Sequence, residues 1–229
     1  MAGAVGTVGG GAGAHAAANR AAESAKGRGA GRVTTWASLG ERTRAQVDSS
    51  GVVFEVLRED QEHTTSLLKA GKVMAAVTSV AEAVQGCRSE LLGTMTYHPV
   101  CSPGFLARQM DGEVTAEKLG KVTVVDFDRK DQTQNRFFRD FAGKPLRAPR
   151  HYIPTTADYA RAILLGLGWG LLPDRQCLDE IDRGDLVEFA PGHAIEIPLY
   201  WQRWTLDSPL IENLTDAVRM VAAREMHQA

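Results

Sequence analysis

The segment 155–173 constrains the fold of this chain more than any other stretch. Pro154 favours an extended conformation in the residue before it, and Thr155 or Thr156 then offers a hydroxyl as a helix N-cap. Apolar residues follow at helical spacing, two glycines end the helix, and residues 169–172 form a short apolar run. This order predicts a parallel α/β unit whose helix N-terminus can face a ligand. An ordinary capped helix that binds nothing is the alternative.

Similar patterns recur along the chain. Residues 52–57 and 73–77 are apolar runs on either side of a short helical stretch, which predicts a βαβ unit with parallel strands. Residues 122–127 predict another buried strand, followed by a helix over about 132–141. Pro209 suits the first position of a C-terminal helix. The chain is therefore expected to be an α/β protein.

Composition excludes several classes of protein. The chain has 229 residues, of which 44% are apolar and 24% charged, and no window reaches the ~20 apolar residues of a membrane span. Its three cysteines show no disulfide or zinc-binding spacing, and its six histidines form no HxH or HExxH pair. No nucleophile elbow, phosphate-binding loop or dinucleotide fingerprint is present. We therefore expect no cofactor, no metal, no membrane contact and no catalysis, in a reducing cytoplasm.

The first 32 residues differ from the rest of the chain. Glycine and alanine supply 20 of them and there is no aromatic residue, so we expect residues 1–32 to be disordered. This segment has four basic residues and one acidic, a charge of +3, which leaves 22 basic and 27 acidic residues, or −5, for the remainder. An acidic body does not suggest nucleic-acid binding by the folded part.

Several segments resemble one known family. They include "LREDQEHTTSLLKAGKVMAAVTS", "YHPVCSPGFLARQM", "VTVVDFDRKD", "YIPTTADYARAILLGLGWGLLP", "IDRGDLVEFAPG" and "PLYWQRW". The chain resembles the effector-binding domain of LysR-type transcriptional regulators, LysG/ArgP branch, from about residue 52 to 223. The resemblance implies a two-lobed α/β fold like that of type II periplasmic binding proteins, in which each lobe is a mixed sheet flanked by helices.

The resemblance also implies a division into lobes. Residues 33–98 with 201–229 are expected to form lobe I, and residues 99–200 lobe II. Full-length members begin with a winged helix-turn-helix, which nothing in this chain resembles, and only Thr34-Thr35-Trp36 resembles the first strand of the effector domain. We therefore expect a truncated regulator with an incomplete lobe I, which would bind DNA only if a helix-turn-helix were supplied.

In the family that the chain resembles, the effector binds between the lobes, at loops that follow strands. Hydroxyl groups at such positions would bind the carboxylate of an amino acid, and acidic residues would bind the distal cation of lysine or arginine. Simple capping and solvation are the alternatives, and His98 is expected to be a packed or exposed residue. The candidate effector-binding residues are Thr35, Thr78, Ser79, Thr155 and Thr156 for the carboxylate, and Asp60, Asp126 and Asp128 for the cation.

The function implied by the resemblance is that of an effector-binding domain that controls export of lysine or arginine. Its partners would be a small-molecule effector, one of these two amino acids, and further copies of the chain in a homodimer or tetramer. Two other classes stay open: a stand-alone amino-acid-binding protein, and an enzyme on the same two-lobed fold, since fold does not fix function. An exported binding protein would have a cleaved N-terminus, and an enzyme would turn over a small acid.

Overall fold

The structure is a computed structural model that describes residues 30–34, 53–57, 61–206 and 208–228. The chain divides into two compact units. Unit 1 comprises residues 1–93 and 198–229, and unit 2 comprises residues 94–197. The boundaries expected from the sequence, 98/99 and 200/201, lie a few residues from these. Strands β4 (Cys87–Cys101) and β9 (Ile195–Trp204) contribute residues to both units.

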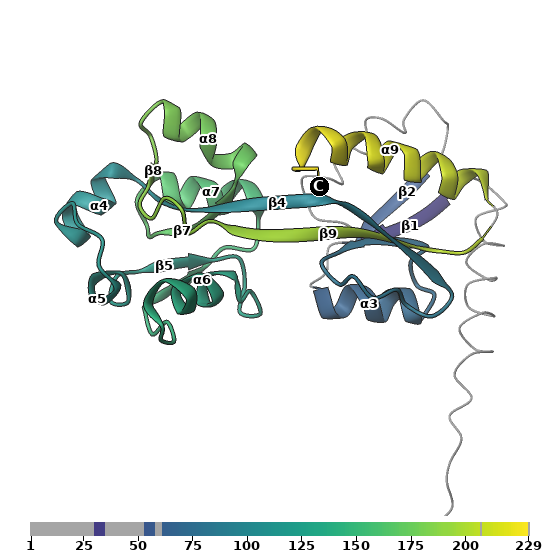
Figure 1. Ribbon diagram of the computed structural model, residues 1–229, viewed down its shortest axis with the longest axis horizontal. Helices are drawn as coiled ribbons and strands as arrows, with labels where there is room; N and C mark the ends of the chain where they lie inside the picture. The colour runs from purple at the N-terminus through teal and green to yellow at the C-terminus, as the bar shows by residue number, and fades with distance from the viewer. Residues whose placement is uncertain (1–29, 35–52, 58–60, 207, 229) are drawn as a thin grey trace, which may run out of the picture. The chain divides into compact units, whose positions relative to one another are not determined.

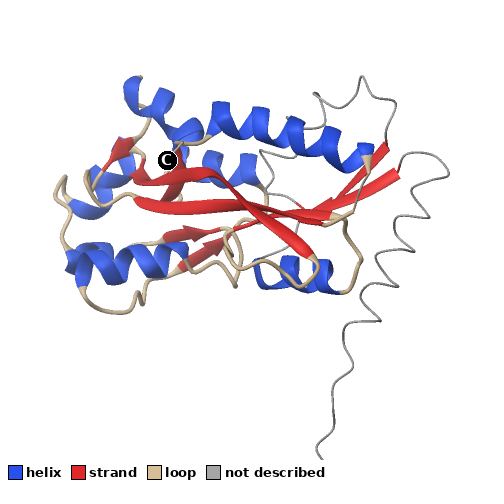
Figure 2. Ribbon diagram, turned by 45° about the vertical axis from the view of Figure 1, so that its right-hand side comes forward, coloured by secondary structure: helices blue, strands red, loops and turns tan. Residues whose placement is uncertain are grey.

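Unit 1 is built on a mixed sheet with the strand order β2-β1-β3-β9. Strand β1 pairs with β2 and β3 in parallel, whereas β3 pairs with β9 antiparallel, Ala75 opposite Arg203 and Thr78 opposite Tyr200. Helices α3 and α9 lie on opposite faces of this sheet (Figures 1 and 2). The other elements of unit 1 are β1 (Ala30–Thr34), β2 (Val53–Leu57), α3 (Gln61–Lys69), β3 (Ala75–Thr78) and α9 (Pro209–Glu225).

Strand β1 contradicts two expectations. It begins at Ala30, inside the segment expected to be disordered, and it supplies a strand that was expected to be missing from the first lobe. Its composition, AGRVT, lacks large apolar residues. It pairs with parallel strands on both sides, and such pairing is made by backbone hydrogen bonds. The remainder of the segment 1–32 lies outside the described residues.

The predicted pairing of the two apolar runs around α3 is also wrong in detail. Strands β2 and β3 are parallel, as expected, but they are not neighbours, because β1 lies between them. The sequence pattern predicts the strands and their direction and contains no information about an inserted third strand. Among the described strands, β2 is therefore an edge of the sheet.

The core of unit 1 combines apolar packing with two buried polar contacts. Helix α9 buries a stripe that includes Leu214, Val218 and Val221, as its spacing predicts. Trp201 of β9 donates from Nε1 to Thr215 Oγ1 at 3.1 Å and so ties α9 to the sheet. Gln202, which is fully buried, donates to the carbonyls of Val80 and Glu82 at 2.8 Å and accepts from Val84 N at 3.1 Å. This one amide holds the loop 80–84 against β9.

Unit 2 contains two small groups of strands covered by helices. Strand β5 pairs with β6 in parallel, and β4 pairs antiparallel with β7 and β8. A parallel bridge between Val124 and Trp169 connects β5 to the start of β7. The elements are α4 (Pro103–Met110), α5 (Ala116–Leu119), β5 (Val124–Asp126), α6 (Thr133–Ala142), β6 (Arg150–Tyr152), α7 (Thr156–Leu164), β7 (Gly170–Pro173), α8 (Asp174–Asp182) and β8 (Val187–Glu188).

The segment 155–173 forms a helix followed by a strand as predicted, α7 and β7, and strand β6 precedes it. Thr155 is the N-cap by backbone geometry, and α7 ends where Gly166 adopts φ +76° and Leu167 N bonds back to Ala162 O at 3.0 Å. Helix α7 buries Tyr159, Ala162 and Ile163 in the core of unit 2. The parallel strand pairing predicted for this segment is limited to the bridge between Trp169 and Val124. Strand β7 itself pairs antiparallel with β4.

Gly170 provides a test of this packing. A Cβ atom at this position would lie 2.6 Å from Ile163 Cδ1 and 2.8 Å from Tyr159 Oη, both on buried side chains of α7. We expect Gly170→Ala to lower the free energy of unfolding by about 1–3 kcal/mol, because a close-packed core resists an added methyl group. Urea denaturation followed by tryptophan fluorescence measures this change.

Gly104→Ala is the matched control. Its new Cβ would meet only the end of the exposed Arg108 side chain, at 3.0 Å, which can move away. We expect that variant to unfold within about 0.5 kcal/mol of the parent chain. Equal losses of stability in the two variants would contradict the packing described for α7 and β7.

Candidate functional site

The carboxyl end of β5 carries a buried ion pair. Asp126, the last residue of β5, has a fully buried side chain, and its Oδ2 is hydrogen-bonded to Arg150 Nη1. The second nitrogen of Arg150 donates to Asn135 Oδ1 of α6 at 2.5 Å. The parallel register places Arg150 opposite Val124, two residues from Asp126 on the same face of the strands. Three elements therefore meet around one carboxylate.

The other oxygen of this carboxylate, Asp126 Oδ1, is buried and has no hydrogen-bond partner. Burial raises the pKa of Asp126 above its usual value, and although Arg150 acts in the opposite direction, burial outweighs it. The nearby Asp131 and Asp128 raise this pKa further. The site thus holds a carboxylate that is only half satisfied, in surroundings that disfavour its charge.

A buried amide lies next to this ion pair. Gln134, in the first turn of α6, donates from Nε2 to Val125 O at 3.2 Å and to Tyr159 Oη at 2.8 Å. Tyr159 Oη also donates to Leu171 O and accepts from Leu171 N, each at 3.2 Å, and burial raises its pKa. The carbonyl oxygen of Gln134 has no partner although the residue is only 1% exposed. A second acceptor, on a residue that bonds to the neighbour of Asp126, is therefore buried and unsatisfied.

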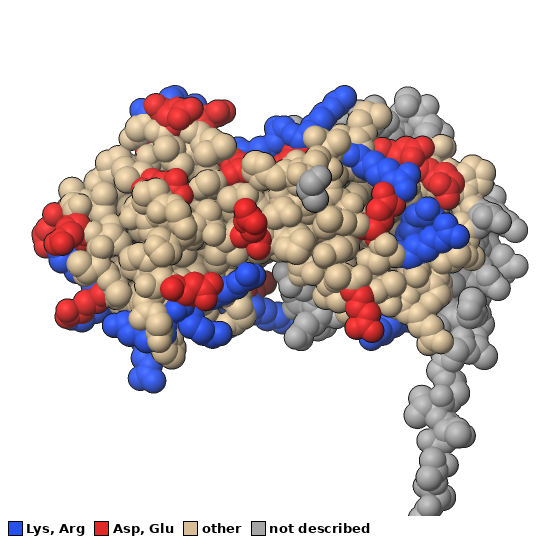
Figure 3. Space-filling view, in the orientation of Figure 1, with Lys and Arg blue, Asp and Glu red and all other residues tan. Residues whose placement is uncertain are grey.

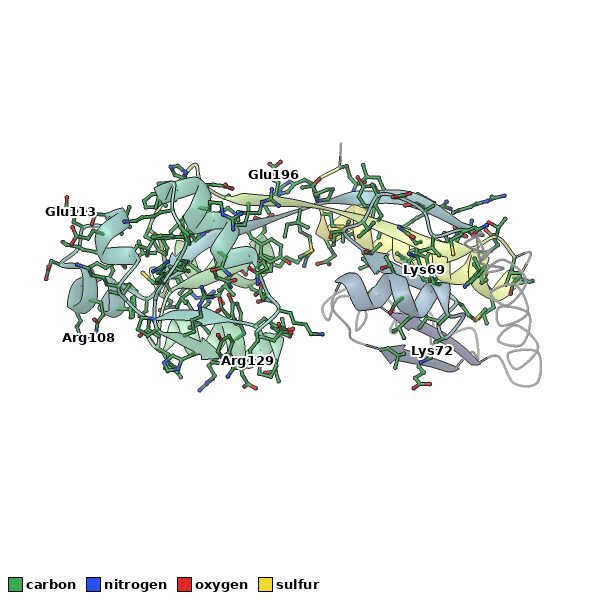
Figure 4. The ribbon with its side chains drawn as sticks, turned by 90° about the horizontal axis from the view of Figure 1, so that it is seen from below. Lys69, Lys72, Arg108, Glu113, Arg129 and Glu196 are labelled. Atoms are coloured by element: carbon green, nitrogen blue, oxygen red, sulfur yellow. The ribbon has the colours of Figure 1, made fainter. Side chains whose placement is uncertain are left out.

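The loop between β5 and α6 is shaped by its own acidic residues. Asp128 Oδ1 accepts from Lys130 N at 2.7 Å and from Asp131 N at 2.9 Å, and Asp131 Oδ1 accepts from Thr133 N at 2.9 Å. Arg129 of the same loop, labelled in Figure 4, stacks over the ring of Tyr152 at 4.6 Å. One oxygen of Asp128 is thus occupied in forming the turn.

The two threonines at the start of α7 differ in their surroundings. Thr155 is exposed and makes no side-chain cap bond, because its hydroxyl instead donates to Asp158 Oδ2. Thr156 is half-buried. The first-turn N–H groups of α7 therefore have no hydroxyl cap from Thr155, which leaves this helix N-terminus suited to an anion.

The remaining candidates belong to unit 1 or lie outside the described residues. Thr78 ends β3 with no exposed surface, and its Oγ1 accepts from Val80 N at 3.2 Å. Ser79 follows it and is half-buried. Thr35 and Asp60 lie outside the described residues. The structure thus places Asp126 at the end of β5 and Asp128 in the loop that follows it in unit 2, and Thr78 at the end of β3 with Ser79 after it in unit 1.

Two residues of this region, Arg150 and Gln134, were not identified from the sequence. They contact Asp126 and its neighbour Val125 through the packing of β6 and α6, for which the sequence contains no local signal. His98, expected from the sequence to be packed or exposed, is held on β4 between two carboxylates: Nε2 lies 2.6 Å from Asp174 Oδ1 and Nδ1 lies 3.0 Å from Glu188 Oε1. His98 is thus a partly buried residue with two acidic partners.

The cysteines of the chain are free and their surroundings do not activate them. Burial raises the pKa of Cys87 to about 11 and the pKa of Cys101 and Cys177 to about 12, so the thiols stay protonated near neutral pH. Across the described residues, no group of three or more His, Cys, Asp or Glu side chains is arranged to hold a metal ion. None of the described helices has the length and apolar character needed to cross a lipid bilayer.

Acidic and basic side chains are mixed on the visible surface. In Figure 3, acidic and basic side chains are interspersed over the described part of the chain, without one continuous field of either sign. A nucleic-acid interface normally has a continuous basic patch. The visible face therefore offers no nucleic-acid footprint.

Comparison with known proteins identifies the family. The family described as "LysR substrate binding domain" matches residues 46–223. The transcriptional regulator ArgP of Pseudomonas aeruginosa is 39% identical over 165 residues, 72% of this chain and 55% of that protein. The lysine export transcriptional regulatory protein LysG of Corynebacterium efficiens is 39% identical over 177 residues, 76% of this chain and 60% of that protein. The chain thus spans little more than half the length of these relatives.

A solved structure agrees with the sequence matches. Full-length LysG of Corynebacterium glutamicum, with the bound effector Arg, is 30% identical and has a TM-score of 0.79, covering 92% of this chain and 75% of that protein. The expected α/β effector-domain fold is confirmed. These relatives are transcriptional regulators, in agreement with the expectation of a domain without catalysis.

The His98 cluster predicts a pH dependence of stability. Burial disfavours the imidazolium, but the hydrogen bonds and charges of Glu188 and Asp174 outweigh burial and raise the pKa of His98 above its ordinary value of 6.5. A raised pKa stabilises the fold fully below about pH 6.5, and this contribution is lost as the pH rises through the folded-state pKa. We expect urea denaturation to give a lower free energy of unfolding at pH 9 than at pH 6, with about 1 kcal/mol of the difference due to His98.

His98→Gln should remove this part of the pH dependence, because its amide does not titrate. His151→Gln, at an exposed position of β6, is the control and should keep the pH dependence of the parent chain. If the His98→Gln variant lost as much stability between pH 6 and pH 9 as the parent, the cluster would not be its source.

Proposed function

The chain belongs to the LysR substrate binding domain family, and we propose that it binds a basic amino acid, lysine or arginine, as the effector-sensing part of a transcriptional regulator of basic amino acid export. The observation that carries the proposal is the similarity to LysG of Corynebacterium glutamicum, which was solved with the bound effector Arg. The relative from Corynebacterium efficiens is named for lysine export, which supports the proposed target process.

Unit 2 offers groups for both ends of such an effector. The N-terminus of α7, with Thr155 and Thr156, has N–H groups and a half-buried hydroxyl that suit a carboxylate. Asp126 has one buried oxygen without a partner, which suits a cationic group. Asp128 is the weaker candidate for that cation, since its Oδ1 already accepts two backbone N–H groups.

Unit 1 contributes Thr78 and Ser79 to the proposal as further hydroxyl donors. Thr78 Oγ1 accepts a hydrogen bond from Val80 N. Because that bond does not use the hydroxyl proton of Thr78, the hydroxyl can also donate to a carboxylate. Thr35 and Asp60 remain in the proposal on the family resemblance alone.

Isothermal titration calorimetry with lysine, arginine, leucine and glutamate tests the proposed function. We expect lysine and arginine to bind at least about tenfold more tightly than leucine, because a charge-assisted hydrogen bond to a buried carboxylate adds roughly 1.5–3 kcal/mol. Glutamate, whose side chain would be repelled by the carboxylates of the β5–α6 loop, serves as the control of opposite charge. Equal affinities for lysine and leucine would refute a site that selects a cation.

A further inference from the structure

Two acceptor atoms in unit 2 are buried without a hydrogen-bond partner, and they belong to one contact network. Asp126 Oδ1 ends β5, and Gln134 Oε1 lies in the first turn of α6. Gln134 bonds to Val125 O, next to Asp126 in the chain, and Asn135, next to Gln134, shares Arg150 with Asp126. An unsatisfied buried acceptor is unfavourable, and each of these two atoms can accept a hydrogen bond from a further donor.

We propose that Asp126 Oδ1 and Gln134 Oε1 together bind the cationic N–H group of the effector, and that Gln134 is a specificity-determining residue of this subsite. The inference rests on the proposed function and adds a residue and a chemistry to it. The ligand group is a side-chain guanidinium or ammonium, both of which carry several N–H donors and can bond to two acceptors at once.

The orientation of the Gln134 amide is set by its surroundings. Nε2 donates both of its hydrogens, one to Val125 O and one to Tyr159 Oη. Tyr159 Oη donates its only hydrogen to Leu171 O, so it cannot also donate to Gln134. Exchanging the nitrogen and oxygen of the amide would therefore place Oε1 against Val125 O, an acceptor facing an acceptor. The carbonyl oxygen must remain the unsatisfied atom.

A second buried amide in the same chain shows the ordinary structural arrangement. Gln202 in unit 1 is as deeply buried as Gln134, and both ends of its amide are satisfied: Nε2 bonds to Val80 O and Glu82 O, and Oε1 accepts from Val84 N. A glutamine that serves only to hold a loop can thus be fully bonded in this fold. The unsatisfied oxygen of Gln134 points to a second role.

The charges that face Asp126 favour a cation over a neutral donor. Arg150 supplies one positive charge, whereas Asp131 and Asp128 act on Asp126 as negative charges in addition to its own. The one guanidinium of Arg150 therefore balances only part of the negative charge of Asp126, Asp128 and Asp131. A bound cation would also offset the burial that raises the pKa of Asp126, so that the carboxylate would be stabilised in its charged form.

Access to the two oxygens requires a local movement, because both are covered in the unliganded chain. The β5–α6 loop directly follows Asp126, and in it Phe127 and Asp128 are half-buried and Arg129 and Lys130 exposed. Short-range hydrogen bonds of Asp128 and Asp131 and the stacking of Arg129 on Tyr152 hold this loop. Binding should therefore change hydrogen exchange in residues 127–131.

The experiment compares arginine with citrulline, which has the same shape but a neutral urea group, by isothermal titration calorimetry of the full chain. We expect the parent chain to prefer arginine by roughly tenfold or more, and Gln134→Leu to lose about tenfold in arginine affinity and most of that preference. Gln109→Leu carries the same substitution at an exposed position of α4 in the same unit and should bind arginine like the parent. Circular dichroism of each variant verifies that it is folded.

Asp126→Asn keeps the shape of the side chain and removes its charge, and it should likewise abolish the preference for arginine over citrulline. If the parent binds arginine and both variants retain its affinity and preference, this inference is overturned while the proposed function stands. If the parent binds no basic amino acid, both are overturned. Hydrogen exchange by mass spectrometry gives an independent result, since unchanged exchange at residues 127–131 on arginine binding would contradict a buried subsite beneath the loop.

Discussion

The burial of the Asp126 carboxylate is the interaction on which the arrangement of unit 2 depends. A buried charge costs several kcal/mol unless a partner of opposite charge is held in good geometry, and here that partner is Arg150 on the neighbouring strand. A slip of one residue between β5 and β6 would turn Arg150 to the opposite face of the strands. The register of the two strands and the position of α6, whose Asn135 holds the second nitrogen of Arg150, are therefore coupled to one ion pair.

Buried polar side chains take the place of backbone ladders at several points of the chain. Gln202 holds a loop of unit 1, the hydroxyl of Tyr159 bonds to both backbone groups of Leu171, and Thr215 joins α9 to Trp201. Each connects elements that are distant in sequence, so each restricts the packing to one arrangement. The Nε2 atom of Gln134 likewise bonds to distant residues, but its Oε1 atom has no partner. This unpartnered oxygen is the atom that we propose binds a ligand.

Local patterns predicted most elements, and contacts between distant residues account for what was missed. The glycine end of α7 and Pro209 at the start of α9 depend on a few neighbouring residues, and both are present. Strand β1 was missed because its stability comes from two neighbouring strands. The partners of His98 lie 76 and 90 residues away, and Arg150 reaches Asp126 over 24, so neither contact has a signature in the sequence. The site was therefore predicted as a set of separate hydroxyl groups and carboxylates, without the groups that bond to them.

The interrupted course of unit 1 has a consequence for biosynthesis. Strand β3 pairs with β9, in which Arg203 lies opposite Ala75. Strand β9 and helix α9 are synthesised after all the other described elements of unit 1. Unit 2, by contrast, is continuous from residue 94 to residue 197. At ~5–20 residues per second, a ribosome needs roughly 5–20 s to produce unit 2 after the first part of unit 1 has emerged. During that interval the early strands of unit 1 lack the strand β9 and the helix α9 that pair with and cover them in the folded unit.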